Sequence, residues 1–234
     1  MAATLDRVSR GRFELGVGVG GEYPPEFRAV GVPMTERGRR TDEALEVLTR
    51  LFTGEPVDFA GRFATIEGEA LSPPPVQRPG PPVWVGGRKD AAVRRAARYG
   101  DVWLPYLVSP ERLRRGLAQV HDLAVDHGRP PGAVRGAVYC WAAVDSDGGW
   151  ARRTAVATVS SLYRQDLTDL ADTHLLCGSP QRVVERIGAY ARAGAEDLVF
   201  APACPAADRD RVVDTFVRDV LPAAHALDEP APRP

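Results

Sequence analysis

The chain has 234 residues, of which 44 % are hydrophobic, so it can bury a sizeable core as one large domain or as a fused pair. Thirty basic and thirty-one acidic residues give a formal net charge of −1, which excludes a global attraction for nucleic acid or for an anionic membrane. We expect a cytosolic protein, because no apolar run approaches the ~20 residues of a membrane span, no signal peptide is recognisable, and three widely spaced cysteines indicate no disulfide framework.

Apolar and glycine patterns then predict strands and helices that alternate along the chain. After the last turn of a helix at 4–9, we expect five short strands, at residues 12–19, 82–85, 101–104, 135–144 and 196–201. Apolar spacing and caps predict helices at residues 35–52, 90–99, 110–126, about 150–172, 179–193 and 208–221. Residues 21–35 are a predicted loop, and the proline-rich residues 55–82 predict irregular chain that allows a short hairpin around Gly61.

This alternation predicts an α/β fold with a parallel sheet and helical crossovers. It fits an open doubly wound sheet and a barrel, and composition does not choose between them. In both architectures ligands bind at the carboxyl ends of the strands. Two glycine-rich segments follow predicted strands at that edge, so the same site is expected for either architecture.

The first of these segments runs from Gly16 to Gly21 and is followed by Glu22. Glycine lets the backbone approach a ligand closely, so the segment indicates a planar ring or a phosphate lying against the main chain. A Rossmann-type dehydrogenase is disfavoured, because about fifteen residues of loop separate these glycines from the next helix. A strand whose small residues allow tight packing explains the same spacing.

The second segment is Gly86-Gly87-Arg88, between a predicted strand and a predicted helix. Paired glycines at this position present N–H groups at a helix N-terminus, which is an anion site, and Arg88 adds a forked contact to a phosphate. The alternative, which this motif taken alone favours, is a tight turn with a solvated arginine.

The other polar residues indicate no catalytic or metal site. We expect His121, His127 and His225 at the surface, whereas His174, ahead of Gly178, is a slightly better candidate for a functional residue. No two histidines have the spacing of metal ligands, and no nucleophile elbow is present. The charged run at residues 36–43 is interpreted as a solvated helix face with i,i+4 pairs such as Arg39–Glu43.

Five segments together resemble the bacterial-luciferase-like monooxygenase family. They are TLDRVSRGRFELGVG (4–18), GEYPPEF (21–27), ERGRR (36–40) with Glu43, PVWVGG (82–87), and GSPQ (178–181) ahead of Ala193-Gly194. The resemblance implies a (β/α)₈ TIM barrel that binds FMN or the deazaflavin coenzyme F420, and it is closest to the F420-dependent branch. It places Gly18, Gly20, Gly21 and Glu22 beside the ring, and Gly86, Gly87 and Arg88 at the phosphate.

The chain departs from that family in length. The segment at residues 4–9 resembles the end of the family's third helix, so about five of eight βα units are expected, and three units correspond to roughly 90 to 100 residues. The predicted domain is therefore a partial barrel over residues 1–227, with a disordered tail at 228–234. Family members take part of the ring pocket and often a catalytic histidine or acid from the first three strands, so no catalytic residue is assigned. Either the true start lies upstream of Met1, or the gene is a truncation that has lost activity.

Two functional hypotheses follow. The first is an oxidoreductase or monooxygenase that transfers hydride between reduced F420, or alternatively FMN, and a small organic substrate. The second is an inactive fragment or binding subunit that docks on a partner barrel through its unpaired edges at 12–19 and 196–201. We also expect a homodimer or other homo-oligomer, with no nucleic acid, membrane or metal as partner. The loops that select a substrate, at 55–82 and 145–178, hold no legible motif; Trp84, Trp103 and Tyr106 either line an apolar slot or belong to the core.

Overall fold

The computed structural model describes residues 1–21 and 23–227. The chain divides into two compact units, one of residues 1–104 with 119–135, the other of residues 105–118 with the chain from 136 onward. None of the described helices is both long and apolar enough to cross a membrane. The tail predicted at 228–234 lies outside the described residues.

Three parallel strands form the sheet of the first unit: β1 (Leu15–Val17), β4 (Val83–Gly86) and β5 (Val102–Leu104). β4 lies between the other two, and its register pairs Val85 with Val17 on one side and with Trp103 on the other. A further ladder bond, from Leu15 N–H to the Pro82 carbonyl at 2.8 Å, extends the β1–β4 pairing. The carboxyl ends of β1 and β4 therefore leave the sheet side by side.

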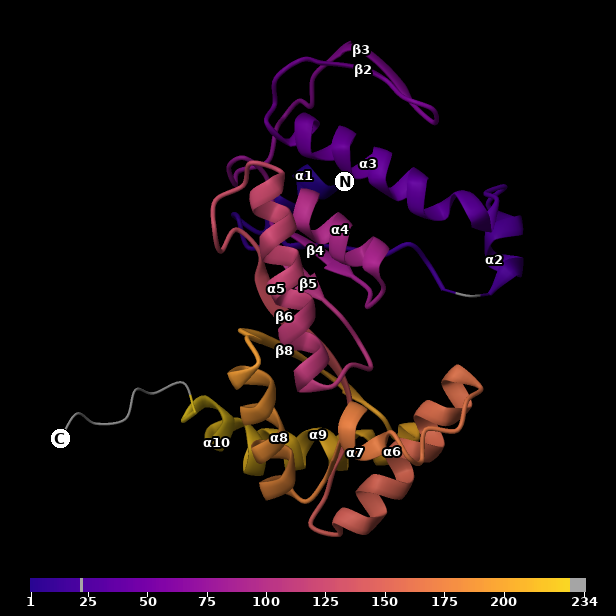
Figure 1. The fold of residues 1–234 in the computed structure, drawn as a ribbon, viewed down its shortest axis with the longest axis vertical. Helices are drawn as coiled ribbons and strands as arrows, with labels where there is room; N and C mark the ends of the chain where they lie inside the picture. Colours follow the sequence, from indigo (N-terminus) through magenta and orange to yellow (C-terminus); the bar gives the residue numbers. More distant parts are fainter. Residues whose placement is uncertain (22, 228–234) are drawn as a thin grey trace, which may run out of the picture. The chain divides into compact units, whose positions relative to one another are not determined.

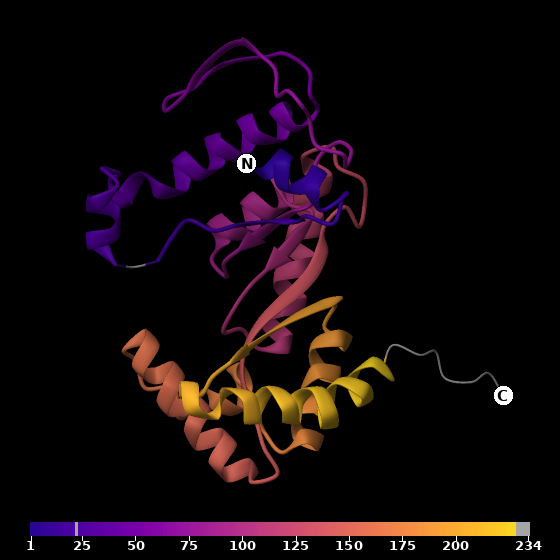
Figure 2. The ribbon, with the colours of Figure 1, turned by 180° about the vertical axis from the view of Figure 1, so that it is seen from behind.

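Helices and a hairpin complete this unit (Figure 1). They are α1 (Ala2–Val8), α2 (Pro24–Ala29), the 3₁₀ turn η1 (Met34–Glu36), α3 (Arg37–Phe52) and α4 (Asp90–Tyr99), with the antiparallel strands β2 (Val57–Ala60) and β3 (Thr65–Glu69). Figures 1 and 2 both show the hairpin beside α3. The hairpin allowed around Gly61 is thereby confirmed.

α4 covers one face of the sheet and is tied to α3. Alanine and valine recur at helical spacing along α4, and its buried positions Ala92, Val93, Ala96 and Ala97 pack on β4. Arg95, only 5 % exposed, donates to Asp42 at 2.6 Å and to the Gly38 carbonyl at 3.2 Å, both on α3. The two helices are thus joined by a buried charge that is paired and hydrogen-bonded.

The second unit holds the other parallel pairings. β6 (Arg135–Val144) pairs with β8 (Asp197–Pro202) from Ala137 to Ala142, and its last three residues pair with β7 (Leu176–Gly178). The helices of this unit are α6 (Gly148–Tyr163), α7 (Ala171–His174), α8 (Pro180–Arg192), η2 (Ala206–Asp208), α9 (Arg209–Thr215), the π-turn η3 (Phe216–Val220) and α10 (Leu221–His225). α5 (Pro110–Asp126) runs through residues of both units.

Most predicted elements are present, and two differ. The chain forms a sixth parallel strand, β7, where no strand is predicted, because no glycine or proline separates it from the helix before it. The helix predicted at about 150–172 is two helices, α6 and α7, since Arg164 ends α6 in a left-handed conformation. Ser179 caps α8 and Pro180 opens it, as predicted.

The charged run on α3 has a role in addition to the predicted one. Glu43 does not form the expected i,i+4 pair with Arg39; its carboxylate accepts the backbone N–H groups of Arg62, Phe63 and Ala64 at 2.7–2.9 Å. A tight turn leaves N–H groups without ladder partners, and a carboxylate satisfies several of them at once. Glu36 and Arg40 do form an i,i+4 pair, at 3.1 Å, as the pattern predicts for this run. The run therefore carries such a pair and, through Glu43, also fastens the hairpin to α3.

Asp6 joins α1 to the segment that leads into β4. Its fully buried carboxylate accepts the N–H groups of Val76 at 2.6 Å and Gln77 at 3.0 Å, and the Gln77 side-chain amide at 2.7 Å. Burial alone would raise the pKa of Asp6, but the hydrogen bonds from Gln77 and Val76 outweigh it and leave the pKa below its ordinary value. Asp6 thus stabilises the folded chain most in its charged form.

We predict that Asp6→Asn lowers the free energy of unfolding by roughly 1–3 kcal/mol near neutral pH. Because the folded pKa is depressed, the contribution of Asp6 is complete above its unfolded pKa of about 3.9 and is lost as the pH falls through the lower folded value. Urea unfolding of both proteins across this range measures the difference, which should shrink toward acid. A difference that stays constant with pH would contradict this account.

Candidate functional site

The two glycine-rich segments meet at one edge of the first unit. β1 ends at Val17 opposite Val85 of β4, so Gly18 and Gly86 are the next residues at two adjacent strand ends. Side chains alternate between faces along a strand, and Gly16 lies opposite Trp84. Gly16, Gly18 and Gly86 therefore share one face, opposite to the face that packs on α4.

Packing within the chain does not explain these glycines. Among the described residues, a Cβ atom added at Gly16, Gly18 or Gly21 meets no heavy atom within 4 Å, and one at Gly86 meets only the Val17 carbonyl oxygen, at an ordinary 3.5 Å. None of the four has the positive φ that favours glycine. The first unit thus presents bare, unobstructed backbone at the tips of β1 and β4.

Gly20 and Gly87 are glycines for structural reasons. Gly20 has φ +82°, and an added Cβ would lie 2.9 Å from the Phe27 ring; Gly87 has φ +126°, and an added Cβ would lie 2.9 Å from the Cβ of Ala92. The N–H of Gly87 also donates to the Leu104 carbonyl at 3.2 Å, and its carbonyl accepts the Trp103 indole N–H at 2.9 Å. The expectation of available N–H groups is therefore wrong at Gly87.

The remaining predicted site residues lie beside these tips or outside the described chain. Arg88 is half-buried between Gly87 and Lys89, and Lys89 precedes the first residue of α4. Asp90 places a carboxylate in the first turn of that helix. A negative charge there already interacts with the positive end of the helix dipole, which reduces the attraction left for a phosphate. Glu22 lies outside the described residues.

Sequence reasoning missed two residues that shape the first tip. Arg37 donates from Nη1 to the Gly21 carbonyl at 2.5 Å, and its guanidinium lies 5.7 Å from the centre of the Phe27 ring. The Phe27 ring in turn occupies the space that a Cβ atom at Gly20 would fill. Arg37 belongs to the charged run of α3. A periodic pattern cannot predict its contact with Gly21, because the two residues are sixteen positions apart.

Trp84 and Trp103, left open between substrate slot and core, take different roles. Trp103 is 1 % exposed and belongs to the core. The Trp84 indole N–H donates to the Glu14 carboxylate, and the guanidinium of Arg135 lies 5.9 Å from the Trp84 ring centre. In the second unit, Tyr106 stacks on Tyr163 with ring centres 6.1 Å apart.

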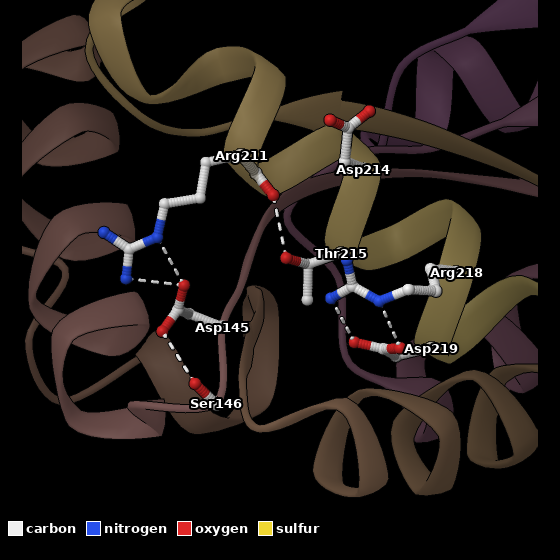
Figure 3. A pocket seen from close by; sticks show the side chains of 7 residues that line it. All are labelled: Asp145, Ser146, Arg211, Asp214, Thr215, Arg218 and Asp219. Carbon is white, nitrogen blue, oxygen red and sulfur yellow. Dashed lines mark hydrogen bonds and ion pairs between the residues drawn. The ribbon is translucent and has the colours of Figure 1, made fainter.

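A polar pocket of about 350 Å³ lies in the second unit, next to the carboxyl end of β6 (Figure 3). Arg211 of α9 donates from Nε and Nη2 to Asp145 at 2.6 Å and lies 4.1 Å from the Trp150 ring centre. Burial raises the pKa of Asp145, but the N–H of Asp147 and the Arg211 guanidinium outweigh it, so the pKa is lowered. Figure 3 shows that Arg218 donates to its neighbour Asp219 and not to Asp145. The Arg211–Asp145 pair fastens the end of β6 to α9, while the Arg218–Asp219 pair lies within η3, and these two structural pairs account for the charged lining of the pocket.

Histidines and cysteines bring no further site together. His121 contacts the Val134 carbonyl at 2.9 Å, and His174 contacts the Thr173 hydroxyl at 2.7 Å. Burial raises the pKa of Cys140 to about 12 and of Cys177 to about 11, so both thiols stay protonated at neutral pH. Among the described residues, no three His, Cys, Asp or Glu side chains group as metal ligands do.

Comparison with known proteins adds a family and a fold. A family model described as luciferase-like monooxygenase matches residues 1–197. Among solved structures, the chain is similar to an F420-dependent secondary alcohol dehydrogenase in complex with an F420-acetone adduct, with 22 % identity and a TM-score of 0.79, over 95 % of this chain and 73 % of that one.

Two other solved structures show the same likeness. The coenzyme F420-dependent tetrahydromethanopterin reductase from Methanopyrus kandleri has 18 % identity and a TM-score of 0.71, over 94 % of this chain and 77 % of that one. The monooxygenase RslO1 from Streptomyces bottropensis has 25 % identity and a TM-score of 0.74, over 94 % and 71 %. These likenesses confirm the predicted fold class, an α/β fold of the incomplete TIM-barrel type.

The two groups of glycines predict opposite effects on stability. Gly87→Ala should lower the free energy of unfolding by roughly 1–3 kcal/mol, because alanine is strained at φ +126° and its Cβ collides with Ala92. Gly18→Ala should leave stability within about 0.5 kcal/mol or raise it slightly. Chemical denaturation measures both. Equal losses would show that Gly18 is a packing residue and would remove it from the site.

Proposed function

The chain belongs to the luciferase-like monooxygenase family, and from that premise we propose that it is an oxidoreductase that binds coenzyme F420, or alternatively FMN, at the tips of β1 and β4. The observation that carries the proposal is the bare backbone of Gly16, Gly18, Gly21 and Gly86, which has no packing explanation inside the chain. A flat ring needs such close approach to the main chain.

Each part of this edge has a role in the proposed binding. Gly18 and Gly21 would lie along the ring, together with Glu22, while Gly20 gives the loop its turn. Gly86 and Arg88 would lie toward the phosphate, where Arg88 brings a forked cation that suits phosphate oxygens. Gly87 would hold the turn, since its N–H is already bonded to Leu104.

The chain's own contribution is orientation. Arg37 and Phe27 hold the loop at Gly20 and Gly21, so the surface offered to the ring is fixed before binding. A bound F420 or FMN supplies the hydride chemistry, and the protein supplies its position relative to a small organic substrate. Two of the similar structures carry F420-dependent activities in their names, which supports the deazaflavin as the first choice.

We predict that the 234-residue chain binds F420 saturably, and that Gly18→Val weakens binding by at least about tenfold because its side chain fills the space above the strand tip. Cofactor fluorescence during titration measures this, with FMN titrated in parallel. Ala60→Val, which places the same side chain at an exposed position of β2, is the control and should bind like the original. Absence of binding by both cofactors would refute the proposal.

A second candidate function rests on the free edge of β1. In the part of the chain that the structure describes, β1 pairs with β4 and with no other strand, and Glu14, Gly16 and Gly18 are exposed. Unpaired edges favour pairing with another chain. This observation supports a binding subunit, or a homodimer or other homo-oligomer joined through that edge.

The mass of the chain in solution distinguishes a monomer from a homo-oligomer joined through the β1 edge. If the β1 edge pairs between copies, light scattering after size exclusion should give a multiple of 25.3 kDa. Leu15 donates toward β4, so the N–H of the next residue, Gly16, lies on the free side of β1, and Gly16→Pro should shift the population toward monomer. Ala70→Pro, at an exposed position directly after β3, is the control and should leave the mass unchanged. A well-behaved monomer at all concentrations would exclude edge pairing.

A further inference from the structure

The strands of the first unit border a second cavity at their amino ends, opposite to the glycine tips. Val83 begins β4, Asp101 precedes β5 and Arg135 begins β6, and all three line a space of about 590 Å³. Phe52, Pro79 and Pro82 form an apolar part of its wall. This volume lies within the range of small-molecule sites, ~300–1,000 Å³.

Positive charge dominates the polar part of the wall. Four arginines line the cavity, Arg78, Arg98, Arg129 and Arg135, against the single carboxylate of Asp101. Asp101 already serves the backbone, because its Oδ2 accepts the N–H of Val83 at 2.8 Å, while its Oδ1 lies 3.5 Å from Arg129. Within the wall the four guanidinium groups outnumber this carboxylate, and Arg98 has a second carboxylate partner outside the wall, Glu46.

Arg129 is held in a fixed position. Its Nη1 donates to the carbonyl oxygens of Ala97 at 3.1 Å and Gly100 at 2.6 Å, at the carboxyl end of α4, and its side chain is only 21 % exposed. Burial lowers the pKa of Arg129, and the nearby charge of Asp101 restores it only in part. A further negative charge in the cavity would therefore stabilise this guanidinium.

Arg78 and Arg98 bring two more guanidinium groups to the cavity with modest commitments elsewhere. Arg78 donates to the Pro75 carbonyl at 3.4 Å, a neutral partner. Arg98 forms an ion pair with Glu46 at 3.3 Å and lies 4.9 Å from the centre of the Tyr99 ring. Each bond uses one nitrogen of a planar group that carries five N–H donors. Such groups match the two oxygens of a carboxylate or phosphate.

We propose that this cavity binds a small organic oxyanion, a carboxylate or phosphate carried on an apolar body, with Arg78, Arg98 and Arg129 around the anionic group and Phe52, Pro79 and Pro82 against the body. The site lies at the other end of the strands from the proposed cofactor site and shares no residue with it. Either proposal can therefore fail while the other stands.

Calorimetric titration of the 234-residue chain at low ionic strength tests this site with phenyl phosphate, benzoate, inorganic phosphate and benzyl alcohol. At least one of the two organic anions should saturate a single site, and the stronger of them identifies the anionic group. Benzyl alcohol, which lacks the charge, and inorganic phosphate, which lacks the body, should each bind about tenfold more weakly. Added salt should weaken the binding of the anion.

Substitutions locate the binding. Arg78→Gln should lower the affinity for the organic anion by about tenfold, and the double variant Arg78→Gln with Arg98→Gln should lower it further. Thermal melts verify that both variants fold. Arg39→Gln, on the exposed side of α3 and outside the cavity, is the matched control and should leave affinity unchanged. The proposal is overturned if neither organic anion saturates, if benzyl alcohol or inorganic phosphate binds equally well, or if the double variant binds like Arg39→Gln.

Discussion

The parallel pairing of β1 with β4 is the constraint on which the candidate site depends. Sixty-eight positions separate Leu15 from its partner Val83, and nothing local in either segment brings them together. The pairing is secured from the amino side by Asp6, whose buried carboxylate holds the chain at Val76 and Gln77 just before β4 begins. Once the register is fixed, two glycine segments that are remote in sequence become neighbouring strand ends. A slip of one residue would move Gly16 and Gly18 to the face packed on α4.

The two ends of the same short strands differ in chemistry. At the carboxyl ends glycines leave the backbone exposed, whereas at the amino ends guanidinium groups surround one aspartate. The buried Arg95 of α4 keeps this helix against α3 by its pair with Asp42. A rigid centre with variable ends is how parallel α/β proteins carry their sites.

Sequence reasoning predicted the alternation of strands and helices, the fold class and the position of both glycine segments, since each depends on local periodicity or on a motif. It missed β7, which no glycine or proline separates from the preceding helix. It also misjudged Glu43 and Arg37, whose partners are backbone atoms sixteen or more residues away. It also treated Gly18 and Gly87 alike, although φ and the neighbouring Ala92 give Gly87 a structural role. Backbone dihedrals and distant contacts are properties of the folded chain, and no spacing in the sequence encodes them directly.

Gly16 and Gly18 are not explained by the conformational preference of their backbone or by packing in the observed structure. Glycine in or beside a strand costs about 0.5–1 kcal/mol relative to alanine, and here an added Cβ would meet open space at ordinary φ. A residue that lowers stability, fills no tight contact and adopts no special backbone conformation has no purpose within the isolated chain. Such conflicts are expected where a surface must accommodate something else. The proposed flat cofactor, lying against the backbone at the strand tips, would resolve this conflict.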